Sequence, residues 1–137
     1  LWGSRRIGPD LARLGGKYPD LWHVRHMEDP RSITNKSIMP AYPHMLTKPL
    51  DYASIQSRVD AMAMLGVPYG DAVKAGAAER MAREQAKQVA ANIASQGGPQ
   101  GLEDKQIVAM VAYLQRLGQD IKKASPAQTA SAAPHAR

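Results

Sequence analysis

The 137-residue sequence contains no cysteine and no phenylalanine. Without cysteine, the chain can build neither a disulfide framework nor a cysteine metal site. Aromatic residues make up only 5% of the sequence, although hydrophobic residues reach 44%. The core therefore has few large side chains, and two explanations stay open. Either the protein is an Ala-rich helical one, or a bulky group that is not an amino acid completes the core.

Long hydrophobic runs are also lacking. No apolar segment is long enough to cross a bilayer, and the sequence starts at Leu1 without an initiator methionine or a signal peptide. We therefore expect a processed product or a piece of a longer protein.

Positive charge is in excess, with a formal net charge of +6. Residues 1–50 carry eight Lys and Arg against four Asp and Glu, whereas residues 51–123 carry nine against eight. Such an excess attracts acidic proteins, anionic lipid or nucleic acid. Basic and aromatic residues are not interleaved as a base-stacking surface requires, so we expect no nucleic acid partner.

Helical periodicity and the Gly and Pro positions predict an all-α protein with long loops and no strand. Residues 1–19 and 30–50 read as loops. Asp20 is predicted to cap the first helix and Asp51 the second. The predicted helices cover residues 20–28, 52–65, 72–95 and 103–117.

The last predicted helix has the clearest apolar stripe. Glu103 and Asp104 stand near its start and Gly118 at its end.

The helix over 72–95 is Ala-rich with a weak apolar face, so we expect it on the surface or against a partner. Residues 124–137 are of low complexity and are expected to be disordered. The apolar stripe of the last predicted helix consists of Ile107, Met110, Val111, Leu114 and Leu117.

Met39 stands in the segment "SIMPAYPHM" between two prolines of the second loop. Pro40 restricts the methionine backbone to extended conformations, and Pro43 restrains the chain again. From the residues alone, the segment is either an ordinary proline-rich loop or a device that aims a thioether.

Three segments occur in a defined order: "GPDLARLGG" at 8–16, "MPAY" at 39–42 and "IVAMVAYLQRLG" at 107–118. In this order they resemble the class I cytochrome c domain. With "LWGSRRIGPDLARLGGKYPDLWHVRHMEDPR" and "LGVPY" at 65–69, the sequence more closely resembles the mono-haem subunit of cbb(3)-type haem–copper oxidases. This is subunit II, the FixO/CcoO family, and the resemblance covers about residues 1–118.

The resemblance implies a class I cytochrome c-like fold and a haem c site. Met39 would be an axial ligand of the haem iron, and Met/His ligation raises the haem potential. The carbonyl of Pro9 would accept a hydrogen bond from the proximal histidine. The implied cofactor-binding residues are Arg5, Arg6, Gly8, Pro9, Leu11, Tyr18, Trp22, Ile38, Met39 and Pro40.

Several of these residues have an alternative interpretation. Arg5 and Arg6 either pair with haem propionates or are solvated surface arginines. Tyr18 and Trp22 suit either the propionate edge of a haem pocket or packing at the core or its rim. His23 and His26, at i and i+3, lack an obvious third ligand for a metal site, and we expect them on the surface. 

Other groups near the predicted site have lesser roles. His44 could replace Met39 only if the loop refolded. Tyr113, Leu114 and Leu117 match the C-terminal helix of the class I fold, where such residues pack against the N-terminal helix and the haem edge. The remaining methionines are expected to be packing or surface residues: Met45, Met62, Met64, Met81 and Met110.

Family members attach haem through Cys-x-x-Cys-His and have an N-terminal membrane anchor, and the sequence contains neither. We expect residues 1–123 to form a cytochrome c-like domain whose first helix and haem-attachment segment lie upstream or on another chain. Either the anchor or partner subunits would then hold the protein at the periplasmic side of the bacterial inner membrane.

The implied function is electron transfer, without catalysis by this chain itself. Electrons would pass from a donor cytochrome through the haem towards the oxygen-reducing catalytic subunit, within a complex that includes other cytochrome subunits. A haem-free docking module, or a non-functional fragment of such a cytochrome, is the alternative. A basic nucleic-acid-binding helical protein is a third reading, supported only by the isoelectric point of about 9.8.

Overall fold

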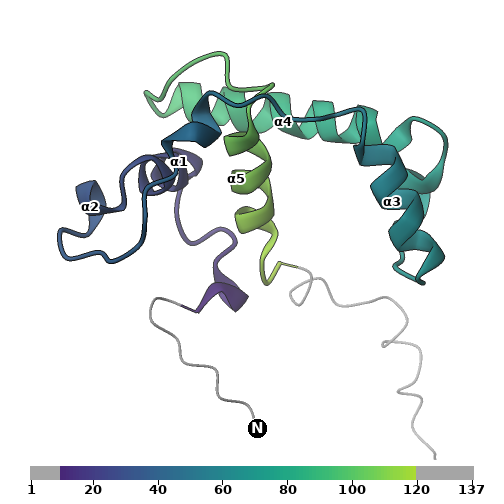
Figure 1. Cartoon of the computed structure of the whole chain (residues 1–137), viewed down its shortest axis with the longest axis horizontal. Helices are drawn as coiled ribbons and strands as arrows, with labels where there is room; N and C mark the ends of the chain where they lie inside the picture. The colour runs from purple at the N-terminus through teal and green to yellow at the C-terminus, as the bar shows by residue number, and fades with distance from the viewer. Residues whose placement is uncertain (1–9, 120–137) are drawn as a thin grey trace, which may run out of the picture.

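The computed structural model describes residues 10–119, and within them every regular element is a helix. An isolated bridge between Pro49 and Lys105 is the only sheet-like pairing in this range. The described part of the chain thus confirms the predicted all-α fold. In Figure 1, α4 runs along the top, α5 descends from it, α1 and α2 lie on one side, and α3 lies on the other. The elements are η1 (Leu11–Arg13), α1 (Asp20–Glu28), α2 (Pro30–Ile33), η2 (Pro43–Leu46), α3 (Ile55–Met64), η3 (Gly70–Val73), α4 (Ala77–Ser95) and α5 (Gln106–Arg116).

The core lies where α1, the second half of α4 and α5 meet. Ile107 and Val111 of the predicted stripe are fully buried, together with Val108, while Met110 and Leu117 are half-buried. The expectation that the Ala-rich helix lies only on the surface is wrong for α4. Its side chains Ala86, Val89 and Ile93 enter the core, because small residues let the helices approach closely.

Helix α1 has the predicted bounds, but Asp20 does not cap it. Pro19 occupies the N-cap, and Asp20 is the first helical residue. The Asp20 carboxylate is buried and accepts hydrogen bonds from Asn92 Nδ2 at 3.3 Å and Gln115 Nε2 at 2.6 Å. Aspartate is a residue type that favours a helix start, but here its carboxylate oxygens accept hydrogen bonds from residues far along the chain.

The next two helices begin later than predicted. The backbone N–H of Ser54, at the N-cap of α3, donates to Asp51 Oδ1 at 3.3 Å, so Asp51 caps a turn before the helix. The predicted helix from residue 72 is divided. Gly76 has a φ of +68°, a left-handed conformation that separates η3 from α4.

Both predicted loops contain helical turns, and α5 is shorter than expected. Residues 11–13 form η1, and the loop over 30–50 contains α2 and η2. Glu103 and Asp104 lie in the turn before α5 rather than in its first turn. The predicted tail at 124–137 lies outside the described residues. Within residues 10–119, no helix has the length and apolar character needed to cross a membrane.

Candidate functional site

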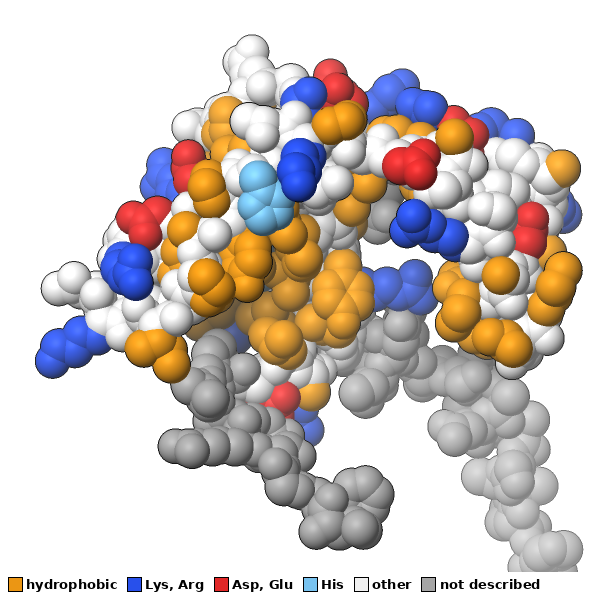
Figure 2. Space-filling model, in the orientation of Figure 1, with side chains coloured by type: hydrophobic (Ala, Val, Ile, Leu, Met, Phe, Trp, Pro, Cys, Tyr) orange, Lys and Arg blue, Asp and Glu red, His pale blue; other side chains and the backbone are white. Residues whose placement is uncertain are grey.

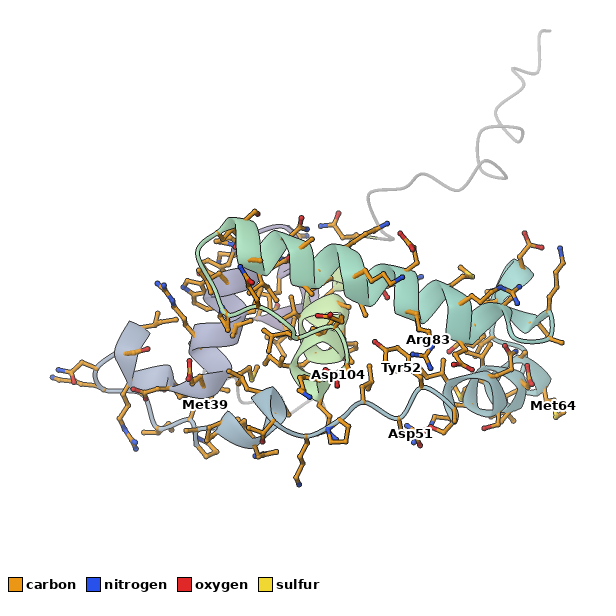
Figure 3. All side chains as sticks on the ribbon, turned by 90° about the horizontal axis from the view of Figure 1, so that it is seen from above. Met39, Asp51, Tyr52, Met64, Arg83 and Asp104 are labelled. Atoms are coloured by element: carbon orange, nitrogen blue, oxygen red, sulfur yellow. The ribbon has the colours of Figure 1, made fainter. Side chains whose placement is uncertain are left out.

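Met39 lies on the loop between α2 and η2, and the chain that follows it is hydrogen-bonded to the body of the protein at two points. The Tyr42 N–H donates to the Met27 carbonyl of α1 at 2.7 Å. Further along, the Gln106 N–H donates to the Lys48 carbonyl at 3.0 Å, at the start of α5. Figure 3 shows Met39 on the α1–α2 side, remote from Met64. The loop therefore gives the methionine a defined place on the body of the protein.

The residues that flank Met39 are more exposed than Met39 itself. Met39 is half-buried, and its N–H donates to Ser37 Oγ at 3.2 Å. Pro40 is exposed and Ile38 is 78% exposed. Of the three predicted residues on this loop, Met39 is therefore the one that partly packs against the protein.

Tyr18 and Trp22 form part of a continuous ring stack along α1. The Tyr18 and Trp22 ring centroids are 4.0 Å apart with planes at 12°, and the Trp22 and His26 centroids are 4.7 Å apart with planes at 7°. Both Tyr18 and Trp22 are half-buried. The structure thus brings these two predicted residues together and adds His26, which the sequence analysis expected on the surface.

His23 is a fully buried residue, so the expectation of a surface pair is wrong for it. His23 is 1% exposed, and its Nε2 has no hydrogen-bond partner. His26 Nδ1 is likewise buried without a partner. Burial lowers the pKa of both imidazoles, and nearby Asp20 offsets part of the effect on His23. Among the described residues, no three or more His, Asp and Glu side chains are grouped to hold a metal ion.

The turn that follows Gly8-Pro9 is bound to the end of α5. The Gly15 N–H donates to the Leu117 carbonyl at 2.9 Å, and the Gly16 N–H donates to Gln115 Oε1 at 2.8 Å. Gln115 Nε2 also donates to the Tyr18 carbonyl at 2.9 Å. Sequence reasoning missed Gln115, because nothing local marks a glutamine whose partners lie almost a hundred residues away.

The other predicted residues of this region lie at or beyond its edge. Leu11 belongs to η1 and is 49% exposed. Arg5, Arg6, Gly8 and Pro9 lie outside the described residues. Of the predicted set near the turn, only Leu11 has a described position.

An apolar surface opens on the face that carries α5. Figure 2 shows hydrophobic side chains gathered there, between the α1–α2 side and α3. Tyr113 of α5 is 61% exposed. A thioether and an apolar surface are the types of group that a haem site uses, the first as a soft axial donor and the second as a dry face. The sequence has no cysteine to form a thioether bond with it.

The helices and the methionine loop define an all-α, cytochrome c-like domain. A family model described as "Cytochrome C oxidase, mono-heme subunit/FixO" matches residues 1–121. The chain belongs to this family of mono-haem oxidase subunits, which implies a haem cofactor, oxidase partners and a membrane complex. A search of curated protein sequences found no match.

Proposed function

We propose that the chain is the electron-transfer part of a haem c subunit in a cbb(3)-type oxidase. It passes electrons from a donor cytochrome towards the oxygen-reducing subunit and catalyses no reaction itself. The observation that carries the proposal is the position of Met39: a half-buried thioether on a loop whose following residues, Tyr42 and Lys48, are hydrogen-bonded to α1 and to the start of α5. Family membership supports the haem and the oxidase.

Met39 would supply its thioether as an axial ligand of the haem iron, and the hydrogen bonds of the chain that follows it would keep the thioether in place in both oxidation states. When bound, the haem supplies the one-electron chemistry, and a methionine ligand raises its reduction potential. The carbonyl of Pro9 would accept a hydrogen bond from the proximal histidine. Arg5 and Arg6 would pair with the haem propionates, Tyr18 and Trp22 would line that edge, and Gly8, Leu11, Ile38 and Pro40 would complete the set.

The haem-attachment segment comes from outside residues 1–137, because the sequence has no cysteine. We place residues 1–123 in one cytochrome c-like domain followed by a tail at 124–137. The complex lies at the periplasmic side of the inner membrane, held by an upstream anchor or by partner subunits.

A haem-free docking module is the second candidate, favoured by the absence of cysteine. Such a module has no chemical need for a thioether on a fixed loop. The two candidates differ in a simple property, since only the first is coloured when isolated with its attachment segment.

The test is an absorbance spectrum of the subunit purified from its native membrane, before and after Met39→Ala. A weak band near about 695 nm in the oxidised protein is expected from methionine ligation and should disappear in the variant. Met64→Ala is the matched control, because Met64 is 87% exposed and lies far from the loop. A colourless complex would overturn the electron-transfer role, and a band that survives Met39→Ala would overturn the ligand.

A further inference from the structure

Exposed hydrophobic side chains concentrate on one part of the molecule, the hairpin formed by α3, η3 and the start of α4. Nine large hydrophobic side chains are exposed within the described residues, and six of them belong to this hairpin. We call these six the hairpin patch. They are Met62 (42% exposed), Met64 (87%), Leu65 (79%), Tyr69 (39%), Val73 (44%) and Met81 (56%).

The hairpin is held together by Gln56, and Ile55 and Ala82 pack it against the core without burying the patch. Helix α3 has no fully buried residue, and the side chain of its Gln56 joins it to η3 and α4. The Gln56 side chain donates to the Ala72 carbonyl at 3.2 Å and accepts from the Ala78 N–H at 3.0 Å. Figure 1 shows α3 on the side of α4 away from α1 and α2. The apolar side chains of the patch are therefore not needed to pack the hairpin against the core.

A cavity of about 590 Å³ lies beside the patch, between α3 and α4. Val59, Pro68 and Tyr69 contribute to its walls, as does Met81. The surface thus combines protruding apolar side chains with a recess, a shape that can be complementary to a partner protein. Three of the six patch residues are methionines, whose flexible side chains adapt to a partner's surface.

Charge near the patch is almost balanced. Residues 55–83 carry four basic side chains and three acidic ones. Lys74 is paired with Asp71 at 2.7 Å, and Arg83 is paired with Glu79 at 2.7 Å. An anionic membrane surface attracts clusters of four or more Lys and Arg, whereas only Arg58 and Arg80 stand outside the ion pairs of this region. A neutral, apolar protein surface is the partner that matches it.

We propose that the hairpin patch docks on an apolar, uncharged surface of another subunit of the oxidase. The proposal rests on the proposed function, because the partner comes from the complex to which the family belongs. It names the face of the chain that makes the contact. Docking buries Met64 and Leu65 at the centre of the contact, since these two are the most exposed members.

Photocross-linking in the native membrane tests the contact without altering charge. A photoreactive amino acid replaces Met64 in one variant and Ala91, exposed on the far half of α4, in the control. The expected result is an adduct between position 64 and a different oxidase subunit, with none from position 91. Adducts to lipid only, to a second copy of this chain, to nothing, or equally from both positions would overturn the proposal.

A charge variant measures how much the contact matters. Met64→Glu combined with Leu65→Glu places two carboxylates in the contact and should reduce co-purification with the oxidase about tenfold. Ala91→Glu with Ser95→Glu adds the same charge on exposed positions of α4 and should leave co-purification unchanged. Haem absorbance of the subunit reports folding. If the patch variant loses that absorbance, it has not folded, and the cross-linking result alone then tests the proposal. If the variant keeps its absorbance and co-purifies as well as the unsubstituted chain, the proposal is overturned.

Failure of the proposed function has a different signature. In that case the unsubstituted chain is colourless and does not co-purify with an oxidase, before any variant is made. A coloured, co-purifying chain without a cross-link at position 64 rejects the patch alone.

Discussion

Among the glycines that the structure describes, Gly15 has the closest neighbour to an added Cβ. A Cβ built there lies 2.2 Å from the Gln115 carbonyl oxygen, which is backbone and cannot rotate away. We predict that Gly15→Ala lowers the free energy of unfolding by about 3 kcal/mol, since overpacking forces the backbone to move. The midpoint of urea unfolding of the purified subunit measures this loss.

Gly97→Ala is the control for Gly15→Ala. Gly97 has a φ of +81° with no atom within 4 Å of an added Cβ, so its substitution costs only backbone strain, about 1 kcal/mol. Equal losses at the two positions would show that the approach of Gly15 to α5 is not a tight contact.

His23 makes stability depend on pH. Burial lowers its pKa below the ordinary 6.5, so the unfolded chain binds more protons than the folded one once the pH falls below that value. Stability is therefore level above about pH 7 and declines as the pH falls through 6.5 towards the lowered pKa. Thermal unfolding between pH 7.5 and pH 5 (roughly the window of histidine titration) should follow this course.

His23→Leu should flatten that pH dependence in part, since His26 contributes in the same direction. His44→Gln is the matched control, because His44 is exposed on η2. If the stability of His23→Leu falls with pH as steeply as that of the unsubstituted protein, the buried imidazole is not the source of the pH dependence.

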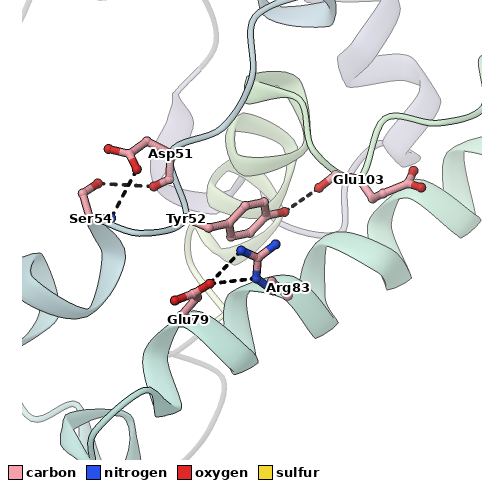
Figure 4. A network of polar contacts seen from close by, with 6 residues as sticks. All are labelled: Asp51, Tyr52, Ser54, Glu79, Arg83 and Glu103. Atoms are coloured by element: carbon pink, nitrogen blue, oxygen red, sulfur yellow. Dashed lines mark hydrogen bonds and ion pairs between the residues drawn. The ribbon is translucent and has the colours of Figure 1, made fainter.

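At the scale of elements, Tyr52 joins three segments: the loop before α3, the turn before α5, and α4. Figure 4 shows its hydroxyl donating to the Glu103 carbonyl while Arg83 of α4 lies over its ring, 4.3 Å from the centroid. Arg83 is held by Glu79, one turn earlier on α4. Burial raises the pKa of Tyr52, so the hydroxyl keeps its proton and remains a donor.

We predict that Tyr52→Phe lowers stability by about 1 kcal/mol, the net value of one hydrogen bond, because the ring and its packing remain. Tyr69→Phe should change stability by less than about 0.5 kcal/mol, since Tyr69 is 39% exposed. Urea titration of the two variants compares them directly. A loss as large for Tyr69→Phe would contradict the role given to the Tyr52 hydroxyl.

Over the whole molecule, stability is unevenly distributed between the core and the α3 hairpin. Helix α5 contributes four buried residues and α3 none. We predict that α3 amides exchange at least about tenfold faster than those of α5 in the subunit separated from the complex, because they open locally. Hydrogen exchange followed by mass spectrometry measures both. Equal protection of the two helices would mean that the described chain unfolds as one unit.

The local features of the protein were predictable from the sequence because they depend on neighbouring residues. Pro30 ends α1, and the spacing of Ile107, Val111 and Leu114 places one side of α5 in the core. The family was recognisable for the same reason, through short segments in a fixed order, of which the one around Met39 is an example.

Tertiary structure alone decided the roles of Asp20, His23 and Gln115. A helix-start aspartate became a buried acceptor because Gln115, ninety-five positions later, lies beside it. A histidine of ordinary appearance became buried because α1 packs against α4 and α5. Periodicity and capping act within a few residues, whereas burial depends on which helices the folded chain brings together, and no local pattern encodes that.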